Sequence, residues 1–182
     1  MEFAPTQIPD VIVIDPVVYE DQRGFLMETW HAKKFREAGI DAEFVQDVHS
    51  RSAKGTVRGL HYQVKQAQGK LIRVIRGEAF DVAVDIRKSS PTFGQWVGEI
   101  LSEGNRKLIW IPPGFAHGFM VLSEFADFEY RMTNFHAPEY ARSIRWDDPE
   151  IGIEWPVPVH SAPLMSDADR KGVALRDAEV YA

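Results

Sequence analysis

The sequence predicts a mainly β protein whose strands form a jelly-roll β-barrel with short flanking helices. Short apolar segments follow one another along all 182 residues, and 13 glycines and 11 prolines separate them at intervals typical of strands. The chain is long enough for one sizeable core. No linker, repeat or low-complexity tract divides it, so residues 1–182 are expected to form a single domain. An immunoglobulin-like sandwich is the alternative arrangement of so many short strands.

The expected elements follow one another from the N-terminus. Early strands are expected at residues 11–14, 24–28 and 42–48, with one helix at 30–38 that Gly39 ends. Later strands are expected at residues 56–63, 70–75, 79–86, 94–101, 107–111, 115–122 and 127–132. Residues 167–172 are expected to start a short C-terminal helix.

The segment 79–86 has the clearest strand pattern. Small and acidic side chains alternate there with large apolar ones, namely Ala79, Asp81, Ala83 and Asp85 with Phe80, Val82, Val84 and Ile86. Because side chains alternate between the faces of a strand, the two sets point in opposite directions. This pattern predicts a strand that is buried on one face only.

Composition excludes several classes of function. A net charge of -6 argues against non-specific nucleic-acid binding, although a local basic cluster could still hold a small anion. Cysteine is absent, which excludes disulfides, thiolate metal sites and a cysteine nucleophile. The first 20 residues lack the pattern of a signal peptide, and no apolar run approaches the length of a membrane span. We therefore expect a cytoplasmic protein that does not associate with membranes.

The segment around His61 carries the residue types most suggestive of chemistry. Arg58, His61 and Lys70 lie in or beside predicted strands. Alternation places Arg58 on one face and His61 on the other, unless a bulge re-aims them. A base and two cations suit removal of a proton from carbon next to a carbonyl, with the cations holding an anionic substrate. The alternative is a β-protein with a few charged strand residues.

Residues 112–118 read as a tight turn that places His117 at the start of a strand. Its Pro-x-Gly-x-x-His form resembles the second signature of the cupin barrel. The first signature aligns loosely with Gly55, His61, Gln63, Lys70 and Gly77. A divalent metal needs neutral or anionic donors, whereas this alignment gives an amide at Gln63 and an ammonium at Lys70. We therefore expect a cupin-like barrel with a metal-free acid–base site, unless Lys70 points to solvent and His117 is a packed core residue.

Two further residues could complete an acid–base site. Tyr130 could supply a phenolic proton, although most strand tyrosines are structural. Asp169 could orient His61, because a carboxylate on one imidazole nitrogen fixes the tautomer and raises basicity. Its alternative role is that of a helix N-terminal acid, with Ser166 as the cap.

Residues near the N-terminus could bind a nucleotide. Arg23 suits bidentate phosphate recognition and Phe25 suits stacking on a base, while Gln46 adds a polar group before the His61 strand. The same residue types are also common on protein surfaces.

Together these segments resemble the dTDP-4-dehydrorhamnose 3,5-epimerase family, in order and over nearly the whole chain. The matching segments are Asp21-x-Arg23-Gly24-Phe25-x-x-Glu28, Gln46-Asp47, Arg58-Gly59-Leu60-His61-Tyr62-Gln63, Gln68-Gly69-Lys70, residues 81–87, 90–94 and 112–119, Tyr130, Trp146-Asp147-Asp148-Pro149, Trp155-Pro156 and Ser166-x-x-Asp169. The resemblance implies a homodimeric jelly-roll isomerase without a cofactor. Its substrate would be a dTDP-4-keto-6-deoxyhexose, converted from dTDP-4-dehydro-6-deoxyglucose to dTDP-4-dehydrorhamnose.

The resemblance also implies roles for individual residues. His61 is expected to be the general base, oriented by Asp169, and Tyr130 the acid on the opposite face. Lys70 is expected to stabilise the enolate oxygen. Substrate contacts are expected from Arg23, Phe25, Glu28, Gln46, Arg58 and His117. In the family, part of the N-terminal segment reaches the neighbouring subunit's site.

Two departures from the family pattern leave alternatives open. Val48 stands where the family usually has asparagine, and Phe135 and His136 stand where it usually has two tyrosines. A relative that inverts C3 alone, on a related nucleotide deoxysugar, is therefore one alternative. A non-catalytic cupin-fold module that binds nucleotide sugars is another, and a metal-dependent cupin oxygenase is a more distant one.

Overall fold

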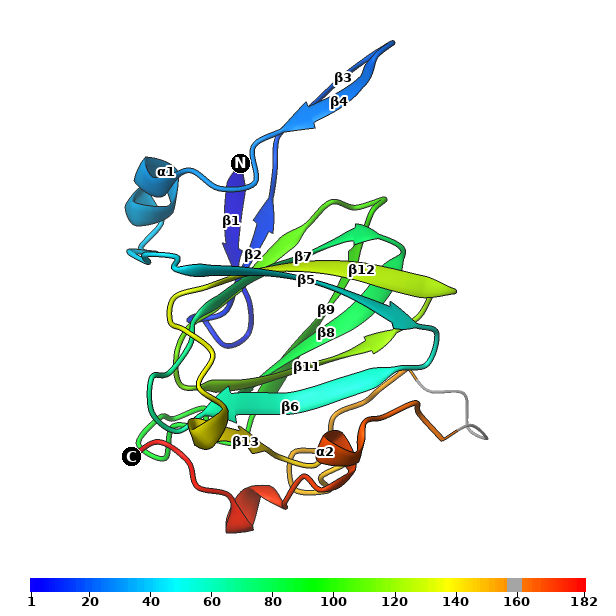
Figure 1. Cartoon of the computed structure of the whole chain (residues 1–182). Coiled ribbons are helices and arrows are strands. Elements are labelled where there is room, and N and C mark those ends of the chain that lie inside the picture. The colour runs from blue at the N-terminus through cyan, green and yellow to red at the C-terminus, as the bar shows by residue number, and fades with distance from the viewer. Residues whose placement is uncertain (157–161) are drawn as a thin grey trace.

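The computed structural model describes residues 1–156 and 162–182, and strands dominate it. Two antiparallel sheets face each other across a common core (Figure 1). One sheet has the order β1 (Glu2–Pro5), β2 (Ile12–Asp15), β10 (Leu108–Ile111), β7 (Lys70–Arg76), β12 (Phe125–Met132) and β5 (Gln46–Ala53). The other has the order β13 (Ala141–Ser143), β6 (Val57–Gln63), β11 (Phe115–Val121), β8 (Glu78–Asp85) and β9 (Trp96–Ser102).

The connections between strands are those of a jelly roll. From β5 to β12, successive strands pass from one sheet to the other, except for the β8–β9 hairpin. Such crossing produces a double-sheet jelly roll of eight strands. The prediction of a mainly β jelly roll with short helices is confirmed. The helices are α1 (Ala32–Glu37), α2 (Asp167–Arg170) and the 3₁₀ turns Pro138–Tyr140 and Leu175–Asp177.

The interior between the sheets holds the main core. Its large members include Ile72, Phe119, Phe128 and Tyr130, and the Phe119 and Phe128 rings lie 4.0 Å apart between centroids. A second apolar cluster lies on the outer face of the five-stranded sheet. There Val82 and Val84 of β8 pack with Leu60, Ile144, Ile151 and Leu175.

That second cluster corrects the prediction for residues 79–86. The apolar side chains Val82, Val84 and Ile86 are buried, but Ala79 and Ala83 on the face with the small side chains are buried too, and it is this face that lines the main core. Side chains that cover the opposite face come from residues after β12, far along the chain. The alternation therefore identified the strand and its two faces correctly, and only the exposure of one face was wrong.

Most of the other predicted elements are confirmed with small shifts at their ends. The strand predicted at 42–48 begins only at Gln46 and continues to Ala53, so its first half was wrong. Three short strands, β1, β13 and β3 (Val18–Asp21), were not expected from the sequence. They are three or four residues long, which is too short for a periodic apolar pattern to appear.

The hairpin of β3 and β4 (Gly24–Met27) projects away from the two sheets (Figure 1). Its apolar side chains are largely exposed, with Tyr19 at 67%, Phe25 at 57% and Leu26 at 69%. Arg106 contacts the hairpin through Glu20 at 2.5 Å and through the Phe25 ring at 4.3 Å. Isolated two-stranded hairpins are only marginally stable in water, so this one is a candidate for contact with another surface.

Candidate active site

A pocket of about 390 Å³ opens into the interior of the jelly roll. Both sheets contribute to its walls. The lining residues are Gln46, Val48 and Ser50 of β5, Arg58 and His61 of β6, Lys70 of β7, His117 and Phe119 of β11, Tyr130 and Met132 of β12, and His136. The structure therefore brings the predicted base, acid, enolate-stabilising cation and three of the predicted substrate contacts into one cavity.

A bulge in β6 places Arg58 and His61 on the same side of the strand. In the pairing with β11, His61 lies opposite His117 but Arg58 lies opposite Phe119, so β6 has one extra residue between the two pairs. The exception that was left open, a bulge that re-aims Arg58 and His61, is therefore the arrangement found.

Gly59 makes the bulge possible. Its φ of +124° suits glycine, and a Cβ there would lie 2.5 Å from Cα of Gly118 on the neighbouring strand. Only glycine, which has no side chain, fits where β6 and β11 approach each other so closely.

Asp169 contacts His61, as expected if this carboxylate orients the imidazole. His61 Nε2 lies 2.6 Å from Asp169 Oδ1, which also accepts from the Gly59 N–H. Because an ionised carboxylate can only accept, Nε2–H donates and Nδ1 keeps the basic lone pair. Burial favours a raised pKa for Asp169, but hydrogen bonds from His61, Ser166 and Gly59 outweigh it and hold this pKa well below its ordinary range.

The alternative role of Asp169 is also confirmed. Ser166 caps α2, and Asp169 is the third residue of a capping box in which each side chain accepts from the other residue's backbone N–H. The same carboxylate thus contributes to the N-terminal cap of α2 through Oδ2 and contacts the His61 imidazole through Oδ1. The short helix therefore fixes the carboxylate that holds the His61 imidazole.

Lys70 lies inside the pocket and does not point to solvent. Only 9% of it is exposed. Burial lowers the pKa of the Lys70 ammonium to about 8, and the nearby Asp81 carboxylate partly offsets this. The side chain is therefore mainly cationic at neutral pH and can place a positive charge against an oxygen that becomes negative during a reaction.

Tyr130 and His117 line the same pocket. Their rings are 6.2 Å apart in an edge-to-face arrangement, and Tyr130 stacks on Phe128. Burial raises the pKa of Tyr130, so the phenol stays protonated and can act only as an acid near neutral pH. Burial lowers the pKa of His117, whose Nε2 lies 2.9 Å from Asp81 Oδ2.

Three predicted substrate contacts do not reach the pocket. Arg23 lies on the projecting hairpin and pairs with Asp21, and Phe25 lies under Arg106. Glu28 follows the hairpin and pairs with Lys34 at 2.7 Å. In this chain by itself, the expected diphosphate and base contacts of these residues lie outside the cavity. Gln46 and Arg58, by contrast, stand in its wall.

Two polar residues of this region were not predicted to have a role. Asp81 was recognised only as part of a strand pattern, yet it is fully buried and bonded to His117. Ser50 lines the pocket beside Tyr130. An acidic residue among the small side chains of an inward face was the available signal for Asp81. Gln63, which the cupin alignment placed at a ligand position, instead anchors the loop around His136, because its amide donates to the Phe135 carbonyl and accepts from the Ala137 N–H.

The same loop brings the two departures from the family pattern together. Val48 and His136 both line the pocket, and the His136 N–H donates to Gln46 Oε1 at 2.9 Å. Phe135 is mostly exposed.

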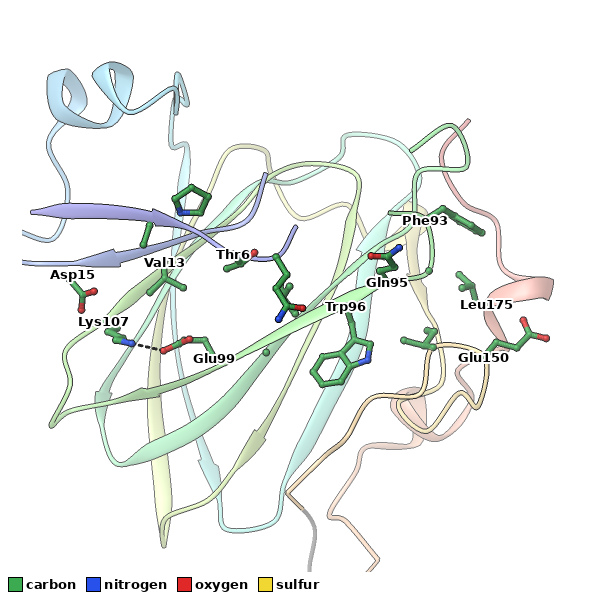
Figure 2. A pocket seen from close by; sticks show the side chains of 17 residues that line it. Thr6, Val13, Asp15, Phe93, Gln95, Trp96, Glu99, Lys107, Glu150 and Leu175 are labelled. Carbon is green, nitrogen blue, oxygen red and sulfur yellow. Dashed lines mark hydrogen bonds and ion pairs between the residues drawn. The ribbon is translucent and has the colours of Figure 1, made fainter. Parts of the chain in front are cut away.

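A second cavity, of about 1090 Å³, lies elsewhere, along β9 and the β1–β2 edge (Figure 2). Its one lysine, Lys107, pairs with Glu99 at 2.6 Å, and the other charged residues lining it, Asp15 and Glu150, are acidic. Of the described residues that line this cavity, none is a histidine, tyrosine or arginine. The smaller pocket is therefore the one equipped for acid–base chemistry on an anionic ligand.

Within residues 1–156 and 162–182, no three histidine or acidic side chains gather in a way that could hold a metal ion. The metal-free reaction remains a prediction from the position of Lys70. In the same part of the chain, every helix falls short of the length and apolarity that a membrane crossing requires.

Comparison with known proteins identifies the family. The family model described as dTDP-4-dehydrorhamnose 3,5-epimerase matches residues 5–177. The protein of that name from Pseudomonas aeruginosa is 58% identical over 175 residues, which cover 96% of each chain. That from Shigella flexneri is 54% identical and covers 100% of this chain and 99% of its own.

A solved structure agrees with the sequence relatives. The dTDP-6-deoxy-D-glucose-3,5-epimerase of Legionella pneumophila, in complex with dTDP-4-keto-L-rhamnose, superposes with a TM-score of 0.94 and 50% identity, and the match covers 98% of this chain and 94% of that one. This confirms the predicted fold class. The family model, the full-length relatives and the common fold together show that the chain belongs to the dTDP-4-dehydrorhamnose 3,5-epimerase family.

Proposed function

We propose that this protein is an isomerase that inverts C3 and C5 of dTDP-4-dehydro-6-deoxyglucose to give dTDP-4-dehydrorhamnose. The observation that carries the proposal is the presence of His61, Tyr130 and Lys70 in one pocket. Relatives named dTDP-4-dehydrorhamnose 3,5-epimerase match the chain along almost its full length. The substrate's diphosphate would meet Arg58, whose Nε bonds to Ser52.

The proposed chemistry needs only proton transfers. The C4 ketone acidifies C3 and C5. Nδ1 of His61 takes a proton from one of these carbons, and the electron pair moves to O4 to give an enolate. The Lys70 ammonium stabilises that oxyanion. Tyr130 then donates a proton to the carbon from the opposite face, so the carbon is inverted. Exchange with water returns the proton lost by Tyr130 and removes the one gained by His61.

Solvent deuterium tests this function. The wild-type protein, incubated in deuterated water with dTDP-4-dehydro-6-deoxyglucose, is expected to place deuterium at both C3 and C5 of the inverted product, as read by NMR. Label at C3 alone, with C5 retained, would establish the C3-only alternative. Binding without label at either carbon would establish a non-catalytic module.

The pH dependence of turnover should report the Lys70 ammonium. Because the pKa of Lys70 is lowered to about 8, the cation is present below that pH and is lost above it. We expect turnover to fall with rising pH above this value, by about tenfold per pH unit. In Lys70→Arg the remaining activity should show no such decline, since guanidinium stays charged. An identical decline in both proteins would contradict the assignment.

We further propose that the protein is a homodimer in which the β3–β4 hairpin completes the partner's pocket. The exposed Phe25 and Leu26 and the distance of Arg23 from its own pocket support this arrangement. The cytoplasmic location remains a prediction.

Mixed dimers test the hairpin directly. Arg23→Ala should weaken substrate binding, and His61→Asn should abolish turnover, so each protein alone is impaired. Refolded together, they should form some dimers in which an intact pocket faces an intact hairpin, and activity should recover towards one quarter of the wild-type level, because roughly half of randomly paired dimers are mixed and each has one complete site. No recovery would show that each pocket uses its own hairpin.

A further inference from the structure

A buried polar cluster joins the two sheets behind the pocket. It consists of Lys70 on β7, Asp81 on β8 and His117 on β11. Asp81 is 0% exposed and is absent from the pocket wall, so it lies behind the residues that a ligand would touch. Its Oδ2 binds His117, while Oδ1 is buried without a hydrogen-bond partner in the described part of the chain. The Asp81 carboxylate takes no part in the proton transfers proposed above.

The contact with Asp81 fixes the proton on His117. Burial lowers the pKa of His117, so its imidazole is neutral at pH 7. A carboxylate accepts hydrogen bonds and does not donate them, so Nε2 must carry the proton that points to Asp81. Nδ1 is then an acceptor. In this state His117 can receive a hydrogen bond from a sugar hydroxyl but cannot protonate a sugar oxygen.

The charge of Asp81 also acts on two groups that must hold protons. A neutral imidazole leaves the negative charge of Asp81 uncompensated, and its attraction opposes the loss of the Lys70 proton that burial favours. Tyr130 is kept protonated mainly by burial, and the negative charge of Asp81 adds to this effect. The other titratable or charged groups around the pocket are Arg58, His61, His117 and His136. Among the described residues, Asp81 is the acidic group whose charge opposes the loss of the Lys70 proton.

We propose that Asp81 is a positioning residue that keeps Lys70 cationic and Tyr130 protonated and presents His117 with Nδ1 as an acceptor. Its effect on the reaction rests on the proposed function. The charge state of Lys70 and the tautomer of His117 do not, because both exist without substrate.

The decisive experiment is a titration of Lys70 without substrate. Lysine labelled with ¹³C at Cε is followed by NMR in the wild type and in Asp81→Asn, and the Lys70 signal is identified by its loss in Lys70→Arg. We expect the Asp81→Asn midpoint to fall by about one pH unit or more, a tenfold change in the ammonium-to-amine ratio. Asp85→Asn is the matched control, because Asp85 is equally buried on the same strand but is bonded to Arg87, Ser90 and Thr92.

An unmoved midpoint in Asp81→Asn, or an equal shift in Asp85→Asn, would overturn the proposal. Should Asp81→Asn not fold, ¹⁵N-histidine NMR of the wild type decides the matter. We expect His117 to be protonated at Nε2 alone, and protonation at Nδ1 would overturn the proposal.

Turnover of Asp81→Asn extends the test to catalysis. We expect kcat to fall at pH 8 more than KM rises, with the alkaline decline displaced to lower pH by the same amount as the Lys70 midpoint. A purely structural role would lower the activity at all pH values equally. If the wild type has no epimerase activity while the Lys70 midpoint shifts as expected, the proposed function fails and the electrostatic role of Asp81 stands.

Discussion

Replacing Lys70 with methionine is expected to lower turnover by roughly two to four orders of magnitude while changing substrate affinity far less. The physical reason is the timing of the charge it stabilises. The ketone oxygen of the substrate is neutral, and it becomes negative only as the proton leaves carbon. A buried ammonium stabilises that negative charge strongly because water does not screen it. Methionine keeps the length and apolar stem of the side chain, so the buried pocket should not collapse.

The measurement is kcat and KM of the variant, with binding of dTDP by calorimetry as a second readout. Lys107→Met is the control, because Lys107 pairs with Glu99 beside the other cavity and should leave turnover unchanged. A Lys70→Met protein with wild-type kcat would remove Lys70 from the chemistry. Loss of affinity without loss of kcat would make it a substrate-binding group only.

His61→Asn is expected to reduce deuterium exchange at both C3 and C5 by roughly 10²–10⁴-fold. The Asp169 carboxylate keeps its hydrogen bonds from the Gly59 N–H and from Ser166, so it retains partners and α2 keeps its cap. What the variant lacks is the basic nitrogen. Binding of dTDP should persist, since that contact belongs to other residues.

His49→Asn provides the matched control for that change. His49 is another histidine beside an aspartate, 3.7 Å from Asp127, but it lies on the outer face of β5. The control should exchange deuterium at the wild-type rate. Equal exchange in His61→Asn and in the wild type would exclude His61 as the base.

Much of the fold was predictable because strands leave local patterns in the sequence. The alternation from Ala79 to Ile86 identified β8 and the division of its side chains between two faces correctly. That both faces are buried was not predictable, because one lines the core between the sheets and Ile144, Ile151 and Leu175 cover the other from a distant part of the chain. Tertiary packing of this kind has no signature within the strand itself.

The site was predictable in its residue types and only partly in its geometry. Motif resemblance brought His61, Lys70, Tyr130 and Asp169 together, and the structure places all four at or beside one pocket. The bulge at Gly59 was left open, since register depends on the pairing with β11.

The resemblance could not place Arg23 and Phe25, because the hairpin that carries them projects away from the two sheets and from the pocket of its own chain (Figure 1). Asp81 was missed because its role depends on His117 and Lys70, which approach it from other strands.

Tyr130→Phe tests the opposed base and acid most directly. Without the phenol, His61 should still remove a proton from C3, but the enolate can be reprotonated only from the face of the base. The variant, followed by NMR in deuterated water, is therefore expected to introduce deuterium at C3 of the unchanged substrate with retention of configuration, and to form little inverted sugar. Inversion at the wild-type rate would show that the proton comes from another group, and would contradict an active site built on His61 and Tyr130.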